Sequence, residues 1–204
     1  MSSVSISSGN MKLGQIPSVS LPSIATCREC KCREKCYASK LERLRPTVRE
    51  AYQRNLTILN NEPETYWREV EGAIMLSRYF RFHVSGDIPN LPYFVNMVNI
   101  AERNQHCEIL CFTKKFGLVN LLVARLHERG SELPKNLHVI FSGWKGLEMD
   151  NPYHLPEAHV LFRDGTTTAR PDAKPCGGNC TDCALTDCGC WTLKPGEQIV
   201  FKEH

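Results

Sequence analysis

Nine of the eleven cysteines in this 204-residue chain lie in two short segments near opposite ends of the sequence. The first segment contains Cys27, Cys30, Cys32 and Cys36, and the second contains Cys176, Cys180, Cys183, Cys188 and Cys190. Closely spaced thiols are typical metal ligands, and the glycines of the second segment allow the backbone to turn tightly around whatever the sulfurs hold. A thiol-bound metal is therefore the first hypothesis.

The spacing of the cysteines favours iron–sulfur clusters over zinc. A structural zinc site normally uses two separated C-x2-C pairs, and each segment offers only one such half. The second segment reads C-x3-C-x2-C-x4-C-x-C, which is closer to the crowded runs that bind a four-iron cluster. We predict two [4Fe–4S] clusters, with zinc and redox-active thiols as the alternatives. The expected ligands are Cys27, Cys32 and Cys36 for one cluster, and Cys176, Cys180, Cys183 and Cys190 for the other.

Cys30 and Cys188 are ambiguous in this assignment, because either is surplus to a minimal ligand set. If Cys27, Cys32 and Cys36 alone bind the first cluster, one iron stays open to substrate, as in catalytic metal sites. Cys107 and Cys111 lie on or beside an expected strand, where a cysteine is usually a small buried hydrophobic residue.

The composition limits the classes of protein to which the chain can belong. No basic, apolar secretory signal precedes the first cysteines, and the cysteine count is odd, so a full set of disulfides is disfavoured. No apolar run is long enough for a membrane span. A net charge of +3, with basic residues spread along the chain, gives little reason to expect nucleic-acid binding.

Helical and strand patterns alternate through the middle of the chain. We expect helices over about residues 37–60 (broken near Pro46), 64–76, 92–103 and 117–129. Apolar residues at helical spacing in the first helix are Leu41, Leu44, Val48, Tyr52 and Leu56. Strands are expected within 78–88, 106–115, 133–146 and 157–165, with a short last strand at 199–201.

This order predicts an α/β fold, either a partial βα-barrel or an open parallel sheet, in a single domain. Residues 1–26 would form an extended arm, 27–76 the first cysteine cluster and helices, 77–165 the βα core, and 166–204 a cysteine-rich C-terminal segment. Because loops at the carboxyl ends of parallel strands host ligands, we expect both cysteine segments to cap that edge of the sheet.

Three other residues at expected strand ends are candidates for catalysis. Asp87 follows Ser85 and Gly86, where it could bind a substrate amine or act as a base, although a turn or helix cap is an equal alternative. Lys114 or its neighbour Lys115 would face the pocket, unless both are solvated. His83 is the third candidate, and a hydrogen-bonded core histidine is the simpler interpretation.

Several short motifs, in order, resemble the phage gene-product-eighty-eight family. They are GNMKLG, TC followed by CYA, FRFHVSGDI, LCFTKK, NPYHLP, and CxxC followed by CW and the terminal His204. The resemblance implies the cytoplasm of a bacterial host. More distantly, CYA after an early cysteine cluster, a GD turn and a TK strand end resemble radical S-adenosylmethionine proteins. Their C-x3-C-x2-C run occurs here only at Cys176, Cys180 and Cys183, so S-adenosylmethionine stays an open alternative as a cofactor.

Two classes of function follow. The first is an iron–sulfur enzyme that removes sulfur or water from a small molecule, for example by cysteine desulfurisation, or performs radical chemistry on it. The second is a protein without catalysis: an electron carrier, or a zinc-stabilised module that contacts a host protein or nucleic acid. No G-x-G-x-x-G or phosphate-binding loop occurs, which disfavours a nucleotide-dependent dehydrogenase. A homo-oligomer is compatible with either class.

Overall fold

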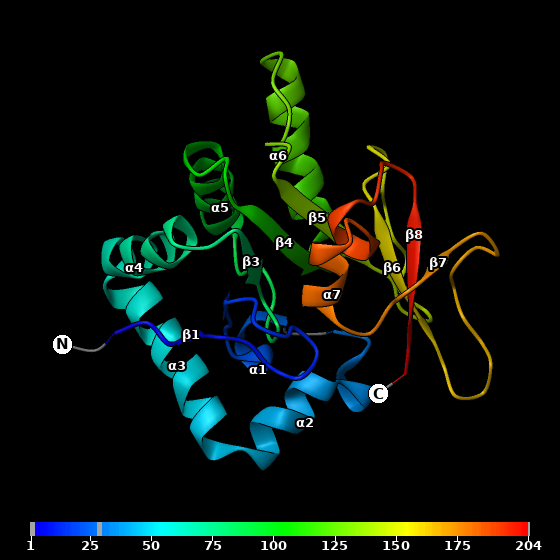
Figure 1. Cartoon of the computed structure of the whole chain (residues 1–204), viewed down its shortest axis with the longest axis horizontal. Coiled ribbons are helices and arrows are strands. Elements are labelled where there is room, and N and C mark those ends of the chain that lie inside the picture. Colours follow the sequence, from blue (N-terminus) through cyan, green and yellow to red (C-terminus); the bar gives the residue numbers. More distant parts are fainter. Residues whose placement is uncertain (1–2, 28–29, 204) are drawn as a thin grey trace.

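A computed structural model describes residues 3–27 and 30–203; His204 of the last family motif lies outside them. Its centre is an open sheet in the order β1-β2-β3-β4-β5-β6-β8-β7, in which only β1 runs antiparallel to its neighbour (Figure 1). The strands are β1 (Ile6–Ser7), β2 (Ser18–Val19), β3 (Tyr79–Phe82), β4 (Glu108–Thr113), β5 (Leu137–Ser142), β6 (Glu157–Leu161), β7 (Lys174–Pro175) and β8 (Gln198–Lys202). The predicted α/β class with a parallel sheet is confirmed.

Seven α-helices and two short 3-10 helices occur in the described part of the chain. They are α1 (Ser23–Cys27), α2 (Tyr37–Leu44), α3 (Pro46–Asn61), α4 (Pro63–Met75), α5 (Leu91–Arg103), α6 (Phe116–Glu128), α7 (Cys180–Leu185), η1 (Arg33–Lys35) and η2 (Gly189–Trp191). Local sequence explains several boundaries. Pro46 and Pro63 occupy first helical turns, where a missing N–H costs nothing, and Asn90 caps α5 by accepting from Tyr93 N at 2.9 Å. None of these helices is long and apolar enough to cross a bilayer.

The two faces of the sheet are covered by different parts of the chain. Alternate strand residues such as Phe80, Ile109 and Val139 face a large core built with α3, α4, α5 and α6. Their neighbours Leu110 and Ile140 face a smaller core formed by the N-terminal turn and the C-terminal cysteine segment. Helices therefore shield one face, and the cysteine-rich ends of the chain lie on the other (Figure 1).

Part of the N-terminal segment is paired into the sheet, whereas we predicted an extended arm over residues 1–26. Ser18 and Val19 pair in parallel with Arg81 and Phe82, which makes β2 the first strand of the parallel set. Val19 is fully buried, as are Leu13 and Leu21 to within 1%. A two-residue strand leaves no periodic pattern, so this arrangement is invisible in the sequence.

Our prediction of an apolar face on the helix after the first cysteines was wrong at Leu41 and Leu44, whereas Leu56 packs against the helix-side core. The break near Pro46 is confirmed, since α2 ends at Leu44 and α3 begins at Pro46. However, Leu41 and Leu44 are exposed, whereas Ala38 and Glu42 are the buried residues of α2. A carboxylate at this inner position requires polar partners, and Ser23 and Ser85 supply them.

Candidate metal centre

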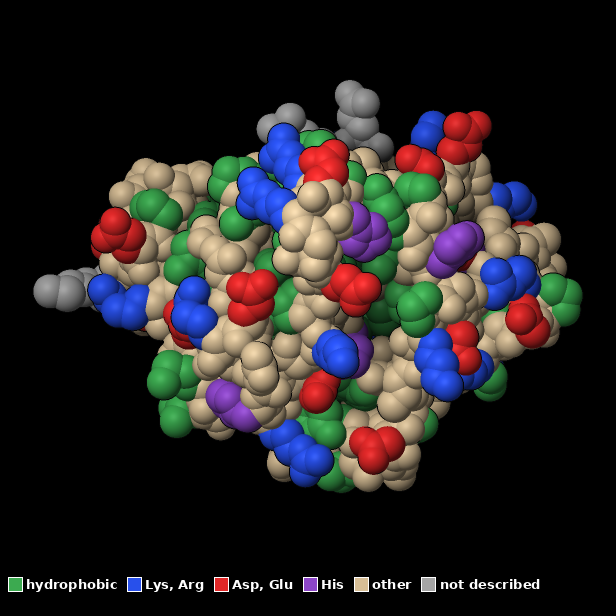
Figure 2. All heavy atoms as spheres, turned by 90° about the horizontal axis from the view of Figure 1, so that it is seen from above, with side chains coloured by type: hydrophobic (Ala, Val, Ile, Leu, Met, Phe, Trp, Pro, Cys, Tyr) green, Lys and Arg blue, Asp and Glu red, His purple; other side chains and the backbone are tan. Residues whose placement is uncertain are grey.

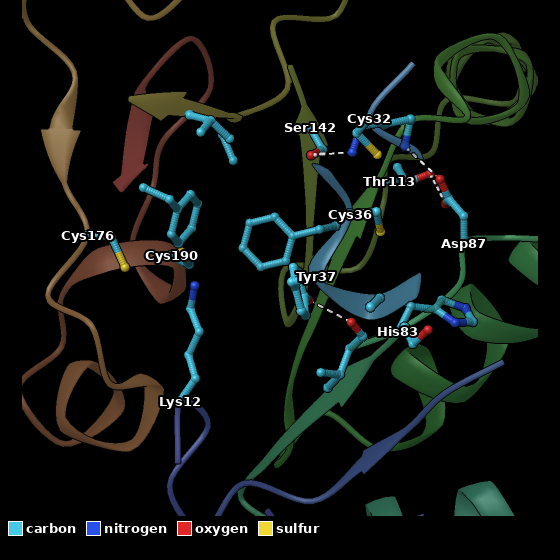
Figure 3. Close-up of a pocket in the computed structure, with 18 of the residues that line it drawn as sticks. Lys12, Cys32, Cys36, Tyr37, His83, Asp87, Thr113, Ser142, Cys176 and Cys190 are labelled. Carbon is cyan, nitrogen blue, oxygen red and sulfur yellow. Dashed lines mark hydrogen bonds between the residues drawn. The ribbon is translucent and has the colours of Figure 1, made fainter. Parts of the chain in front are cut away.

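The two cysteine-rich segments meet across one cavity on the face of the sheet that the long helices leave uncovered. The cavity has a volume of about 200 Å³. Two sets of four cysteines line it: the N-terminal cysteine group (Cys27, Cys30, Cys32 and Cys36) and the C-terminal cysteine group (Cys176, Cys180, Cys183 and Cys190). Figure 3 shows Cys176 and Cys190 on one side, Cys32 and Cys36 on the other, and Tyr37 between them. Thiols some 150 residues apart in sequence thus face the same space.

The N-terminal cysteine group sits on a loop that follows β2 at the carboxyl edge of the sheet. Cys27 ends α1, Cys32 and Cys36 flank η1, and α2 begins directly afterwards. The sulfurs of Cys30 and Cys32 are 2.8 Å apart, although all the cysteines are free thiols. Four cysteines thus occur within ten residues. Cys30, whose role was ambiguous from the sequence, lines the cavity together with the other three.

The Ser85-Gly86-Asp87 turn after β3 holds this cysteine loop in place. The Gly86 backbone has φ +82°, and a Cβ there would lie 2.6 Å from the Leu21 carbonyl and 2.8 Å from Thr26 Oγ1. Glycine is therefore required both by the turn and by the close approach of the α1 segment. Glu42, on the buried side of α2, accepts hydrogen bonds from Ser23 N and Ser85 Oγ. Those contacts explain why a carboxylate occupies the inner face of α2.

The C-terminal cysteine group is built around the short helix α7. Asn179 caps it, accepting from Thr181 N at 2.9 Å and Asp182 N at 3.2 Å. The turn at residues 9–14, GNMKLG, docks against the same helix start: Cys180 N donates to the Lys12 carbonyl, and Thr181 Oγ1 donates to the Leu13 carbonyl. The first family motif therefore serves to position the last cysteines.

Two glycines of the second segment make room for the sulfur of Cys183. A Cβ on Gly177 or Gly189 would lie 3.3 Å or 3.0 Å from Cys183 Sγ, and Gly189 also has φ +64°. Gly178 N donates to Cys176 Sγ at 3.4 Å. Backbone amides that point at sulfur stabilise thiolates. The glycines thus bring the backbone close to the thiols, as their positions in the sequence predicted.

Each cysteine group faces a cation. Lys12 extends toward Cys176 and Cys190 (Figure 3), and Arg81, 7% exposed in the middle of β3, lies close enough to interact with Cys180. The buried Arg81 Nε has no hydrogen-bond partner among the described residues. On the other side, Lys114 is near Cys27, Cys30 and Cys32. Buried cations require negative partners, and ionised or metal-bound cysteines would supply that charge.

The pKa values differ between the two groups. Hydrogen bonds with Cys32 lower the pKa of the Cys30 and Cys36 thiols to about 6, and the same bonds raise the pKa of Cys32. Burial instead raises the pKa of Cys183 to about 11 and also raises that of Cys180 and Cys190. Burial also raises the pKa of Cys27 to about 12. Cys30 and Cys36 are therefore the two thiols of the cavity whose pKa is lowered.

Asp87 and Lys114 lie together at the cavity wall, but the hydrogen bonds of Asp87 favour an anchoring role. Its carboxylate accepts from Thr113 Oγ1 at 2.6 Å, Ile88 N at 2.7 Å and Lys114 N at 2.9 Å. Burial raises the pKa of Asp87, and the three hydrogen bonds, which lower the pKa, offset only part of this effect. Lys114 Nζ donates to Ser142 Oγ at 3.0 Å, which joins the ends of β4 and β5. Thus Asp87 and Lys114 together connect the loops that follow β3, β4 and β5.

His83 also lines the cavity, at the end of β3, with an unusual φ of +60°. It is 3% exposed, and neither ring nitrogen has a hydrogen-bond partner among the described side chains and backbone groups. Burial lowers its pKa to about 3, with Arg81 adding to the effect, so the imidazole is neutral at pH 7. The histidine is buried as expected, but it is not the hydrogen-bonded core residue that we favoured.

The remaining cysteines lie outside the cavity. Cys107 and Cys111 are fully buried in the helix-side core, as their strand positions predicted. Cys188 is exposed, and its sulfur is 3.3 Å from Thr186 Oγ1. Within residues 3–27 and 30–203, no three His, Cys, Asp or Glu side chains are close enough together to hold a single metal ion.

Sequence reasoning missed Lys12 and Arg81, the two cations of the C-terminal cysteine group. Both had a signal: Arg81 interrupts the apolar run Tyr79–Phe82, and Lys12 lies in a six-residue turn bounded by two glycines. A charged residue within a buried strand usually has a buried partner. Identifying that partner required the pairing of β3 with its neighbours and the docking of residues 9–14 on α7.

Together, the fold and the cavity define a cysteine-rich α/β protein that brings thiols from both ends of its chain to one face of a parallel sheet. The chain belongs to the gene product 88 family, whose model matches residues 4–185. The match includes the whole N-terminal cysteine group and stops before Cys190. Neither the curated proteins nor the solved structures contain a significant match.

Proposed function

We propose that this chain is an iron–sulfur protein in which the N-terminal and C-terminal cysteine groups each bind one [4Fe–4S] cluster. The observation that carries the proposal is the convergence of eight thiols, four from each end of the chain, on opposite sides of one cavity. Four cysteines per group match the usual ligand number of such a cluster.

The donor set fits this cofactor better than it fits zinc. A zinc ion bound by four thiolates at about 2.3 Å needs all four sulfurs in one tight cage, and the described residues contain no such cage. A four-iron cluster binds each thiolate through a different iron, so its ligands surround a wider space. Lys12, Arg81 and Lys114 would balance the negative charge of the loaded sites.

We further propose that the cavity between the two groups binds a small anionic molecule. Clusters of this class supply electron transfer and, where an iron lacks a protein ligand, a Lewis acid. The chain's own contribution would be binding and orientation: Arg81 and Lys12 can attract a carboxylate, and Tyr37 and Phe112 provide apolar walls. Sulfur or water elimination from a small acid is compatible with this lining. Asp87 would serve by fixing Lys114 rather than as a free base.

Use of S-adenosylmethionine is the second candidate. It is favoured by one observation: the N-terminal cysteine group follows β2, the first strand of the parallel set, and Ser85-Gly86-Asp87 follows the next strand, β3. This repeats the order of elements on which the distant resemblance to radical S-adenosylmethionine proteins rests. The test is to incubate reduced, cluster-containing protein with S-adenosylmethionine and to measure 5′-deoxyadenosine. If no more product forms than with a variant in which the cysteines of the N-terminal group are replaced by serine, the use of S-adenosylmethionine is excluded.

Metal analysis of protein purified without oxygen tests the main proposal. We expect a brown protein with about eight iron and about eight sulfide per chain, as two four-iron clusters require. Cys176→Ser/Cys180→Ser should halve both values, whereas Cys107→Ala, which changes a buried thiol in the helix-side core and outside the cavity, should leave the iron and sulfide per folded chain unchanged. A colourless folded protein that contains zinc, or no metal, contradicts the proposal.

Single serine variants of Cys27, Cys30, Cys32 and Cys36 decide whether the first site has an open iron. Loss of the cluster in all four would mean a closed site and would favour electron transfer. Retention of the cluster in the Cys30→Ser variant alone would leave three ligands and support catalysis.

A further inference from the structure

The outer surface of α2 combines exposed leucines with exposed basic residues. Leu41 and Leu44 are three positions apart, so they lie on one side of the helix, and they are 36% and 61% exposed. The inner side holds Ala38 and the hydrogen-bonded Glu42. Two leucines therefore face solvent although the same short helix buries a carboxylate.

Basic residues are frequent in the sequence on both sides of these leucines. Residues 30–49 contain seven lysines and arginines, all exposed, and two acidic residues, of which only Glu34 is exposed. The net charge of this segment is +5, whereas the whole chain has +3, so the remaining residues sum to −2. Our expectation that basic residues are spread evenly is therefore wrong for this region. The exposed basic residues are Lys31, Arg33, Lys35, Lys40, Arg43, Arg45 and Arg49.

The face of the molecule seen in Figure 2 does not share this bias. Figure 2 views the molecule from the end at which α6 projects in Figure 1, and there the Lys and Arg side chains are interspersed with Asp and Glu. A mixed surface of this kind is ordinary for a globular protein. The concentration of positive charge around two exposed leucines marks the α2 side as specialised.

This surface adjoins the N-terminal cysteine group. Lys31, Arg33 and Lys35 alternate with Cys30, Cys32 and Cys36 in the sequence, so each is within one or two residues of a thiol. Consecutive Cα atoms are about 3.8 Å apart. The thiols of Cys30 and Cys36 are only partly buried. Any protein that covers the basic residues therefore comes to lie beside these cysteines.

We propose that Lys31, Arg33, Lys40, Arg43, Arg45, Arg49, Leu41 and Leu44, hereafter the α2 surface, dock an acidic one-electron carrier protein. The inference rests on the proposed function in one respect, namely that the N-terminal cysteine group holds a redox centre. In the transfer, the carrier loses one electron and that centre gains it, with no atom exchanged. The carrier is thus the reductant.

The chemistry of the α2 surface favours a protein over nucleic acid. An apolar centre with a charged rim is the usual anatomy of a protein interface, and redox encounters use small ones. Opposite charges speed association and fix orientation without requiring high affinity. Single-stranded nucleic acid would need several aromatic side chains on which bases stack. Residues 31–49 contain one, Tyr37, which lines the cavity and donates its hydroxyl to the Val84 carbonyl.

Direct binding measurements test the docking without reference to any activity. The probe is oxidised flavodoxin, an acidic carrier, titrated calorimetrically into the full chain, with cytochrome c as a basic carrier for comparison. We expect flavodoxin to bind and cytochrome c not to bind. Raising the salt from about 0.05 M to about 0.5 M should weaken flavodoxin binding by about tenfold or more, since screening acts on exposed charges.

Matched charge reversals locate the surface. Lys40→Glu/Arg43→Glu/Arg45→Glu should weaken flavodoxin binding at least tenfold, and Leu44→Ser should weaken it to a smaller extent. The control Arg125→Glu/Arg129→Glu/Lys135→Glu changes the same number of exposed basic residues near the far end of α6 and should bind like the wild type. Circular dichroism of each variant verifies that it is folded.

Three outcomes would overturn the inference: equal binding by both triple variants, no flavodoxin binding by the wild type, or a single-stranded oligonucleotide that binds in place of flavodoxin and is lost in the α2 variant. Iron and sulfide analysis keeps the two proposals separate. Loaded clusters without docking refute only this inference, whereas docking by a protein that never takes up iron refutes only the proposed function.

Discussion

The two cysteine groups face one cavity but are held in different ways. The C-terminal cysteine group rests on a capped helix and is backed by a small core in which Trp191 stacks edge-on against Tyr79 and donates to the Cys180 carbonyl. Among the described residues, the N-terminal cysteine group extends from the end of α1 through η1 to the start of α2, and a second cavity is lined by Cys27 and Cys30. Each group has one buried and three half-buried cysteines, so the two groups differ in the elements that support them and not in exposure.

This difference indicates a division of labour between two otherwise similar sets of thiols. Thiols that are backed by a packed core suit a permanent site, because ligand exchange there requires unpacking of that core. Thiols with lowered pKa values, here Cys30 and Cys36, suit a site that meets substrate or a redox partner. We therefore expect changes in the C-terminal cysteine group to affect folding and changes in the N-terminal cysteine group to affect chemistry.

The largest contrast is expected from paired removal of ligands. Cys180→Ser/Cys183→Ser should lower the melting temperature by about 10 °C or more, because metal binding in a packed site contributes to folding. Cys27→Ser/Cys36→Ser should lower it by only a few degrees. Differential scanning calorimetry of anaerobic protein measures both. Equal losses would mean that the two groups support the fold alike.

Trp191→Ala should be the most damaging single substitution near the cavity. Trp191 is 6% exposed and packs against Tyr79 and His138. Its truncation should cost about 3–5 kcal/mol of unfolding free energy, which urea denaturation measures. Trp144→Ala, at the wall nearer β5, is the comparison and should cost less, since this side chain is only partly buried. A loss below about 1 kcal/mol at Trp191 would contradict the idea of a packed support.

Thiol reactivity should separate the groups in the metal-free, reduced protein. Since the pKa of Cys30 and Cys36 is lowered to about 6, both are largely thiolate at pH 7, whereas Cys183, with a pKa raised to about 11, is almost entirely thiol. Iodoacetamide should alkylate the first pair about 100-fold faster at pH 7. Peptide mass spectrometry across pH 5–10 measures the rates, and similar profiles for all three would refute the contrast.

A pair of glycine substitutions gives the smallest and most specific effect. Gly189→Ala and Gly196→Ala both place a side chain at positive φ, which costs about 1–2 kcal/mol. Only Gly189 lies against Cys183 Sγ, whereas Gly196 has open space around it. Both variants should lose similar stability, and only Gly189→Ala should also lose iron. Full iron content in Gly189→Ala would show that the sulfur can shift without penalty.

Much of the sheet and the clustering of the cysteines could be predicted from the sequence because both leave periodic or clustered signals. The runs around Phe80, Ile109 and Val139 are apolar, and the first two are each followed by a helical pattern. The two-residue strand β2 left no such signal, because Ser18 and Val19 gain their role only by pairing with β3. The positions of Leu41 and Leu44 failed for a related reason, since helical spacing does not show which side of a helix meets the core.

The convergence of the cysteines was out of reach for a different reason. It depends on which face of the sheet each chain end covers, and this is settled by contacts such as that of Thr181 with Leu13. Local sequence contains no information about partners that far apart. Arg81 was detectable as an anomaly within a strand, but its proximity to Cys180 was not.

The GNMKLG turn has a consequence for synthesis of the protein. Residues 12–15 bind residues 180–181, a separation of more than 160 positions. At about 5–20 residues per second, a ribosome takes roughly 8–33 seconds to cover that interval. The early thiols thus emerge well before the late ones are synthesised, and the GNMKLG turn stays without its partner helix until α7 has been made.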